Sequence, residues 1–149
     1  MAGLSLVLVV NAGSETLKLS IVGEDGASEP LASLAALDPE RVVAVGHRIV
    51  HGGPHLREPV VIDAAVEAEI RAVEAIAPLH NAPALAALEH ARNVLPDAPH
   101  VAVFDTAFHA TLPDEAVVYP LPLSWREEWG IRRYGFHGTS VAWAAEQAS

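Results

Sequence analysis

The chain has 149 residues, 51% of them hydrophobic, and a formal net charge of -10 with only 9 Lys and Arg. This length suits a single domain with a real core. The acidic balance argues against nucleic acid as a partner, because nucleic-acid binders need clustered positive charge. No stretch approaches the ~20 apolar residues of a membrane-spanning helix, so we expect no membrane partner. The sequence contains no cysteine, which excludes disulfides and is compatible with the cytoplasmic location that we expect.

The first third of the chain has the pattern of short strands. Residues 6–10 form a continuous apolar run, and apolar and polar residues alternate over 17–21, so the two segments predict a hairpin. Residues 22–37 contain Gly and Pro among acidic and small residues, which indicates a turn followed by a loop or a short helix. Residues 42–50 read as a strand interrupted by Gly46, and 60–62 as a further short strand.

Helical spacing begins at Asp63, which can cap a helix whose apolar residues at 66, 70, 73 and 77 share one face before Pro78 ends it. Asn81 and Pro83 signal the start of a second helix, which should end at Pro96. Residues 101–104 return to a strand. The prolines that follow keep the chain irregular, with a short helical turn capped by Ser124.

A final helix is expected over 141–147, capped by Thr139 or Ser140. Strands first, then alternating helices and strands, predict an α/β fold with a mixed sheet covered by helices.

Two polar positions directly follow apolar strands. Asn11 opens the turn 11–14, where an amide, backbone N–H groups and a glycine can surround a phosphate or a hydrated metal, although such a turn is also an ordinary hairpin turn. Asp105 ends the strand 101–104, where its carboxylate can point into a crevice at the sheet edge or cap the next turn.

Two further side chains suit anion chemistry. Arg48 can pair bidentately with a carboxylate or a phosphoryl group, or it can be a surface arginine. His137 lies between Phe136 and Gly138, so its ring can donate to a ligand that approaches the backbone closely. His47, His51 and His55 recur every four residues, but in a strand this spacing is about 13 Å, too far to share one metal ion.

Four motifs together resemble acetate kinase, the family that transfers a phosphoryl group between ATP and acetate. They are VNAGSETLK at 10–18, GHRIVHGG at 46–53, FDTAFH at 104–109 and RRYGFHGTS at 132–140. The resemblance implies a ribonuclease H-like mixed sheet of five strands with flanking helices. It also implies that residues 1–149 correspond to the N-terminal domain of an acetate kinase and actin-type fold, without the second domain.

The resemblance also implies roles for individual residues. Magnesium and phosphate would be held at Asn11, in a loop lined by Ser14, Thr16 and Lys18, with Mg²⁺ as cofactor and ATP as substrate. Arg48 would be one of two arginines that clamp acetate and the phosphoryl group, with Val50 and Leu79 as apolar walls. Asp105 would act as a base or orient the arginine, and His137 would stabilise the phosphoryl group in transfer. We expect Asn11, Arg48, Asp105 and His137 to converge on one open crevice.

Some features depart from the family pattern. Glu15 and Val141 replace a serine and a histidine of the family motifs, and the connection between Val22 and Val42 is short. Because acetate kinases are more than twice this length, the resemblance implies a domain that is incomplete alone. Its ligand would be acetate or acetyl phosphate, and a complementary second-domain chain would be its partner. The alternative is a non-catalytic remnant or interaction module that binds small carboxylates or phosphate.

Overall fold

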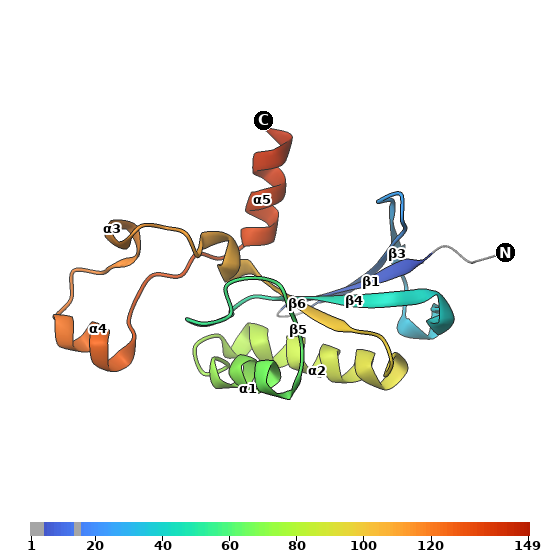
Figure 1. Cartoon of the computed structure of the whole chain (residues 1–149), viewed down its shortest axis with the longest axis horizontal. Helices are drawn as coiled ribbons and strands as arrows, with labels where there is room; N and C mark the ends of the chain where they lie inside the picture. Colours follow the sequence, from blue (N-terminus) through green and yellow to red (C-terminus); the bar gives the residue numbers. More distant parts are fainter. Residues whose placement is uncertain (1–4, 14–15) are drawn as a thin grey trace.

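A six-stranded mixed sheet forms the centre of the computed structural model, which describes residues 5–13 and 16–149 (Figure 1). The strand order is β3-β2-β1-β4-β6-β5. The three central strands are parallel: β1 (Leu6–Ala12), β4 (Val42–Ile49) and β6 (His100–Phe104). Their carboxyl ends therefore lie at one edge of the sheet, which is where ligands bind in sheets of this kind.

The predicted hairpin is confirmed, since β1 pairs antiparallel with β2 (Leu17–Val22). Every second residue of β1 is buried, as the alternation of a sheet with one covered face requires. The expected interruption at Gly46 is wrong: β4 runs through it without a break, and Gly46 pairs with Val9 and Val101 on the neighbouring strands. Cross-strand pairing outweighs the weak strand propensity of one glycine.

The α/β class with a mixed sheet and flanking helices is confirmed, with one strand more than the expected five. The short strand predicted at 60–62 is confirmed as the edge strand β5 (Val60–Val61), which runs antiparallel to β6. The strand that was not predicted lies at the opposite edge of the sheet. It is β3 (Ser28–Leu31), which lies within the segment that we expected to be loop or helix. Pro30 hid this strand in the sequence, but an edge strand tolerates a proline because one side of its backbone is unpaired.

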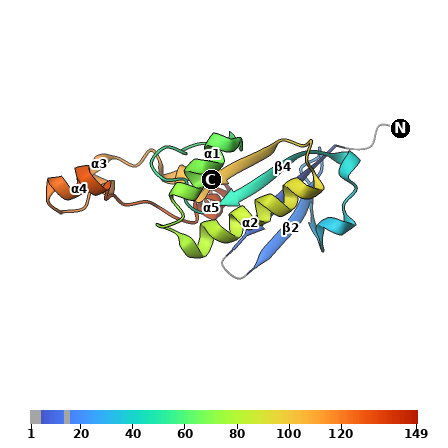
Figure 2. The ribbon, with the colours of Figure 1, turned by 90° about the horizontal axis from the view of Figure 1, so that it is seen from below.

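Helices α1 (Ala64–Ala72) and α2 (Pro78–Val94) cover one face of the sheet (Figure 2). Asp63 caps α1 as predicted by accepting a hydrogen bond from the Val66 N–H. The helix ends earlier than expected, at Ala72, and turns connect it to α2. Helix α2 begins at Pro78, and Pro83 lies inside it near its start instead of marking its beginning.

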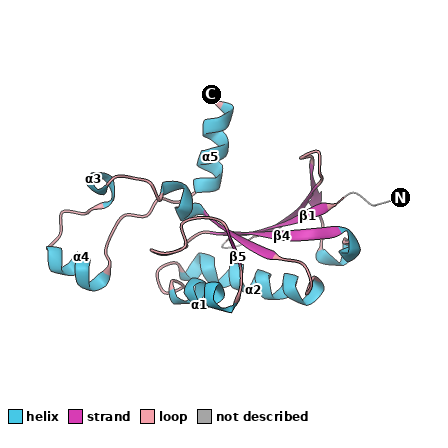
Figure 3. Cartoon of the chain, viewed as in Figure 1, coloured by secondary structure: helices cyan, strands magenta, loops and turns pink. Residues whose placement is uncertain are grey.

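The chain after β6 is less regular. A 3₁₀ turn, η3 (Asp105–His109), leads into an arm that extends away from the sheet and carries α3 (Asp114–Val117) and α4 (Leu123–Trp129) (Figure 3). Helix α4 starts after Pro122 without a side-chain cap from Ser124. The last helix, α5 (Gly138–Gln147), begins before the expected cap residues and projects from the sheet on the side away from α1 and α2 (Figure 1).

The core lies between the sheet and the two helices α1 and α2. Leu8, Val10 and Val45 of the sheet are fully buried, as are Leu88 and Ala91 of α2. Two short 3₁₀ turns, η1 (Leu34–Ala36) and η2 (Pro39–Arg41), precede β4, and Leu34 of η1 belongs to the buried core. Within the described residues, no helix is both long and apolar enough to cross a bilayer.

Candidate functional site

Arg48 and Asp105 form a two-pronged ion pair at the carboxyl ends of the parallel strands. The Arg48 Nε donates to Asp105 Oδ1 at 3.2 Å, and Nη2 donates to Oδ2 at 2.5 Å. Asp105 is fully buried, whereas the Arg48 side chain keeps 22% of its surface exposed. The carboxylate therefore holds the guanidinium in a fixed plane while part of that group still faces solvent.

Two neighbouring segments complete this cluster. Asn11 lies beside Arg48 in the β1–β4 register, and its Oδ1 accepts from Arg48 Nη1 at 3.2 Å. The Thr139 hydroxyl, at the start of α5, donates to Asp105 Oδ1 at 3.0 Å. We call Asn11, Arg48, Asp105 and Thr139 the Arg48 cluster. Its members come from four separate parts of the chain.

The Asp105 carboxyl is held in its charged form. Burial alone raises its pKa, but the hydrogen bonds and the positive charge of Arg48, together with hydrogen bonds from Thr139, outweigh burial and lower the pKa below its usual value. A buried carboxylate that stays ionised at neutral pH orients a cation. It is a poor proton acceptor, because its conjugate acid is destabilised.

An open cavity of about 260 Å³ lies over the ion pair. It is lined by Arg48, Val50, Ile76, Ala77, His80, Asp105, Phe136 and His137. His137 is exposed, so its ring is accessible to a ligand in the cavity. The structure thus brings Arg48, Asp105 and His137 together on one cavity, and Asn11 contacts them through Arg48.

Other sequence-predicted residues lie apart from this cavity. Leu79 is 73% exposed and does not line it, whereas Val50 lines it and is buried. Thr16 and Lys18 are exposed at the end of the β1–β2 hairpin, with Lys18 paired to Asn11 in the register. Ser14 and Glu15 lie outside the described residues.

Five residues of the site received no ligand-binding or catalytic role in the sequence analysis: Ile76, Ala77, His80, Phe136 and Thr139. Phe136 and Thr139 belong to the motif 132–140, so their proximity to His137 was a signal that they lie near the site. Thr139 was read as a helix cap, but its hydroxyl donates to Asp105 instead. Ile76 gave no signal because it lies in the turns between α1 and α2, where helical spacing stops.

Within residues 5–13 and 16–149, no group of three or more His, Cys, Asp or Glu side chains is arranged to hold a metal ion. The Asn11 amide oxygen is an oxygen ligand of the type that Mg²⁺ accepts, but both Asp105 oxygens already accept hydrogen bonds. This donor set fits a magnesium ion whose other ligands are phosphate oxygens and water, with Asn11 as a protein contact. It does not fit a magnesium ion held by the protein alone.

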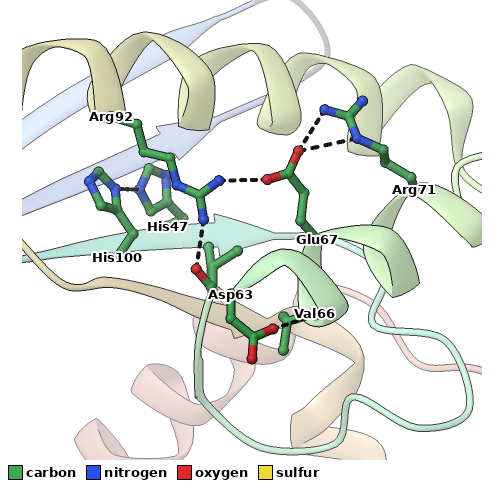
Figure 4. A network of polar contacts seen from close by, with 8 residues as sticks. His47, Asp63, Val66, Glu67, Arg71, Arg92 and His100 are labelled. Atoms are coloured by element: carbon green, nitrogen blue, oxygen red, sulfur yellow. Dashed lines mark hydrogen bonds and ion pairs between the residues drawn. The ribbon is translucent and has the colours of Figure 1, made fainter. Parts of the chain in front are cut away.

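A second polar cluster lies on the opposite face of β4 (Figure 4). His47 and His100 are buried and joined by a 2.8 Å hydrogen bond between Nε2 and Nδ1, and His100 Nε2 donates to the Leu95 carbonyl. Nearby, Arg92 of α2 pairs with Glu67 of α1 at 2.5 Å. Figure 4 shows Arg92 between the histidine pair and Glu67. We call His47, His100, Arg92 and Glu67 the His47 cluster.

Comparison with known proteins places this geometry in a family. The model of the acetokinase family matches residues 35–149. The chain belongs to the acetokinase family. It is 51% identical over 112 residues to the acetate kinase of Geobacter sulfurreducens, covering 75% of this chain and 27% of that protein. The acetate kinase of Deinococcus deserti is 54% identical over 110 residues, covering 74% and 28%.

Solved structures agree with this assignment. A propionate kinase from Francisella tularensis superimposes with a TM-score of 0.86 at 30% identity, covering 97% of this chain and 48% of that chain. The acetate kinase of Porphyromonas gingivalis gives a TM-score of 0.75 at 29% identity with the same coverage. The resemblance read from the four motifs is therefore confirmed. The chain spans about a quarter of the length of the curated acetokinase relatives that it matches.

Proposed function

We propose that this chain is a phosphotransferase domain of the acetate kinase type, which contributes to phosphoryl transfer between ATP and acetate. The proposal depends on the paired Arg48 and Asp105 at a cavity that His137 also lines. Membership of the acetokinase family supports it. We further propose a cytoplasmic location, in keeping with the absence of cysteine from the sequence.

Arg48 is the anion clamp of this proposal. Its guanidinium plane is fixed by Asp105 and Asn11, so it offers an oriented positive charge to a carboxylate or a phosphoryl group without further loss of side-chain freedom. Acetate is already ionised at neutral pH and needs no base to activate it. Asp105 therefore acts by orienting Arg48, which agrees with its lowered pKa.

His137 supplies the second contact to the transferring group. Phosphoryl transfer passes through a loose transition state whose negative charge is spread over the peripheral oxygens. A ring N–H at the cavity rim can donate to one of these oxygens, and Arg48 lies on the same cavity. Neither residue forms a covalent bond, so the phosphoryl group moves directly between the two substrates.

The apolar lining of the cavity selects a short acid. Val50, Ile76 and Phe136 provide hydrocarbon surface within the same 260 Å³ space as Arg48. The carboxylate of the acid pairs with Arg48 while its methyl group contacts this lining. We assign the apolar wall to these three residues, because Leu79 is exposed and lies outside the cavity.

The hairpin between β1 and β2 is the part that we assign to phosphate and magnesium. Asn11 would hold the ion from one side, with Ser14, Thr16 and Lys18 in the same loop near the phosphates. Bound magnesium would neutralise charge on the nucleotide phosphates. The residues of this chain would bind the short acid and the phosphates and orient them for transfer. A complementary second-domain chain would supply the nucleotide-binding surface and the second arginine of the clamp.

Hydroxamate formation from acetyl phosphate tests the proposal. The chain alone should show little or no turnover, and adding a polypeptide that carries the second domain of an acetate kinase should restore it. Failure of the mixture to turn over, combined with phosphate binding by the chain alone, would favour the non-catalytic remnant. Glu15 and Val141, which depart from the family motifs, are the sequence features that support this second reading.

A further inference from the structure

His137 has an unusual backbone conformation. Its φ is 56°, and it is the one residue other than glycine with a positive φ in the described part of the chain. Side chains with a Cβ rarely adopt this left-handed region, and they keep it only where the surrounding structure holds them there. The segment around His137 must therefore be fixed by contacts outside itself.

His109 makes the contact closest to this residue. Its Nε2 lies 3.0 Å from the carbonyl oxygen of Phe136, which belongs to the peptide bond directly before His137. A carbonyl oxygen only accepts, so Nε2 carries the hydrogen and donates. The His109 ring also lies against Gly135, where an added Cβ would be 2.2 Å from the ring. Gly135 thus leaves the space that this ring needs.

The turn that carries His109 also carries Asp105. Both belong to η3, so one short element holds the orienting carboxylate of Arg48 at its start and the donor to Phe136 at its end. Gly138 packs on the Asp105 carbonyl so closely that an added Cβ would lie 2.0 Å from that oxygen. The loop is therefore held against η3 on both sides of His137.

We propose that His109 is a positioning residue for His137. By donating to the Phe136 carbonyl, it fixes the peptide plane that precedes His137 and keeps that residue left-handed at the cavity of Arg48 and Asp105. The sequence analysis gave His109 no role, although it lies in the motif 104–109. The functional consequence rests on the proposed function, because it assumes that His137 meets an anion in the cavity.

Two substitutions separate positioning from simple packing. His109→Phe keeps an aromatic ring against Gly135 but removes the donor, whereas His109→Gln keeps an N–H donor and loses the ring. His90→Phe is the matched control, because His90 is an exposed histidine of α2 away from η3. Thermal melts of all three variants show whether each chain is folded as the wild type is.

Two measurements decide the outcome. The three-bond HN–Hα coupling and the intraresidue NOE of His137 report its φ without any ligand, and a titration with inorganic phosphate, followed at the His137 ring protons, reports binding. We expect His109→Phe to lose the left-handed signature and to bind phosphate about threefold to tenfold more weakly, the usual effect of one hydrogen bond. His109→Gln should recover most of both properties, and His90→Phe should change neither.

An unchanged coupling and an unchanged phosphate affinity in His109→Phe would overturn the assignment. So would equal losses in the Phe and Gln variants, because packing would then explain them. If the wild-type chain alone binds no phosphate, the predicted effect of His109 on anion binding by this chain is wrong, and the coupling of His137 decides the positioning role. The proposed function is tested separately, by turnover of the mixture.

Discussion

His47 and Arg48 are neighbours on β4, but their side chains lie on opposite faces of the sheet in very different surroundings. The His47 cluster lies under α1 and α2, and its two histidines are buried and neutral. The Arg48 cluster lies on the other face, charged and open to a cavity. The alternation of a strand lets one pair of adjacent residues serve the core and the candidate site.

The polar groups of the His47 cluster and those of the Arg48 cluster have different roles. The His47 cluster contains two bonded pairs. His47 bonds to His100, which also donates to the Leu95 carbonyl, and Arg92 bonds to Glu67, so these bonds join secondary-structure elements. In the Arg48 cluster the hydrogen bonds fix the orientation of a guanidinium that still has exposed surface. Substitutions in the first cluster should change stability alone, whereas those in the second should change ligand binding or activity as well as stability.

The largest expected effect is on activity. In the mixture of this chain with a second-domain polypeptide, Arg48→Ala should lower kcat/KM by at least about 100-fold, because charge and orientation are lost together. Lys18→Ala is the comparison and should lower kcat/KM much less, because Lys18 is an exposed point charge on the neighbouring strand and not a bidentate clamp. The hydroxamate assay measures both. Equal losses for the two substitutions would remove the assigned role of Arg48.

The His47 cluster predicts an acid-sensitive core. Burial, then electrostatic interaction with His100 and Arg92, lower the pKa of His47 from 6.5 to about 3. Below pH 6.5 the unfolded chain binds a proton at His47 that the folded chain does not. The free energy of unfolding therefore decreases as the pH is lowered, and at pH 5 it should be about 2 kcal/mol smaller than at pH 7. Urea unfolding at pH 7 and pH 5 measures this loss. His47→Gln should flatten the dependence, and an unchanged pH slope in that variant would contradict the prediction.

Asp105→Asn tests the charge of the Arg48 cluster. Removing the carboxylate charge leaves Arg48 poorly paired, and we expect a loss of about 1.5 kcal/mol at pH 7, a typical value for hydrogen bonds to a charged group. The folded pKa of Asp105 is lowered, so its stabilisation is present above the unfolded value of 3.8 and disappears as the pH falls through the folded value. The difference in free energy of unfolding between the wild type and Asp105→Asn should therefore become smaller below about pH 4.

Asp97→Asn is the control for this comparison, because Asp97 is an exposed carboxylate in the turn before β6. It should leave the urea midpoint at pH 7 unchanged. A loss as large as that of Asp105→Asn would mean that net charge, rather than the pair with Arg48, explains the effect.

Part of this arrangement could be predicted from the sequence. The positions of Asn11 and Asp105 at strand ends predicted their common edge, because parallel strands end together. The edge strand β3 could not be predicted, since Pro30 and the acidic residues around it match a loop unless the partner strand is known. The donor from His109 to Phe136 was also hidden, because it joins residues 27 positions apart through a side chain. Local patterns carry no information about such contacts.

The smallest expected effect separates two arginines that share Glu67. Arg71 pairs with Glu67 within α1, and its side chain is 54% exposed, so Arg71→Ala should not measurably change the Tm. Arg92 also donates to the Ile62 carbonyl at 2.6 Å, and Arg92→Ala should cost about 1 kcal/mol because that carbonyl loses its side-chain donor. Differential scanning calorimetry of the two variants measures the contrast. If the Tm decreases by the same amount in both variants, the pairing with Glu67 alone accounts for the effect. Arg92 then has no separate role in joining α2 to the segment before α1.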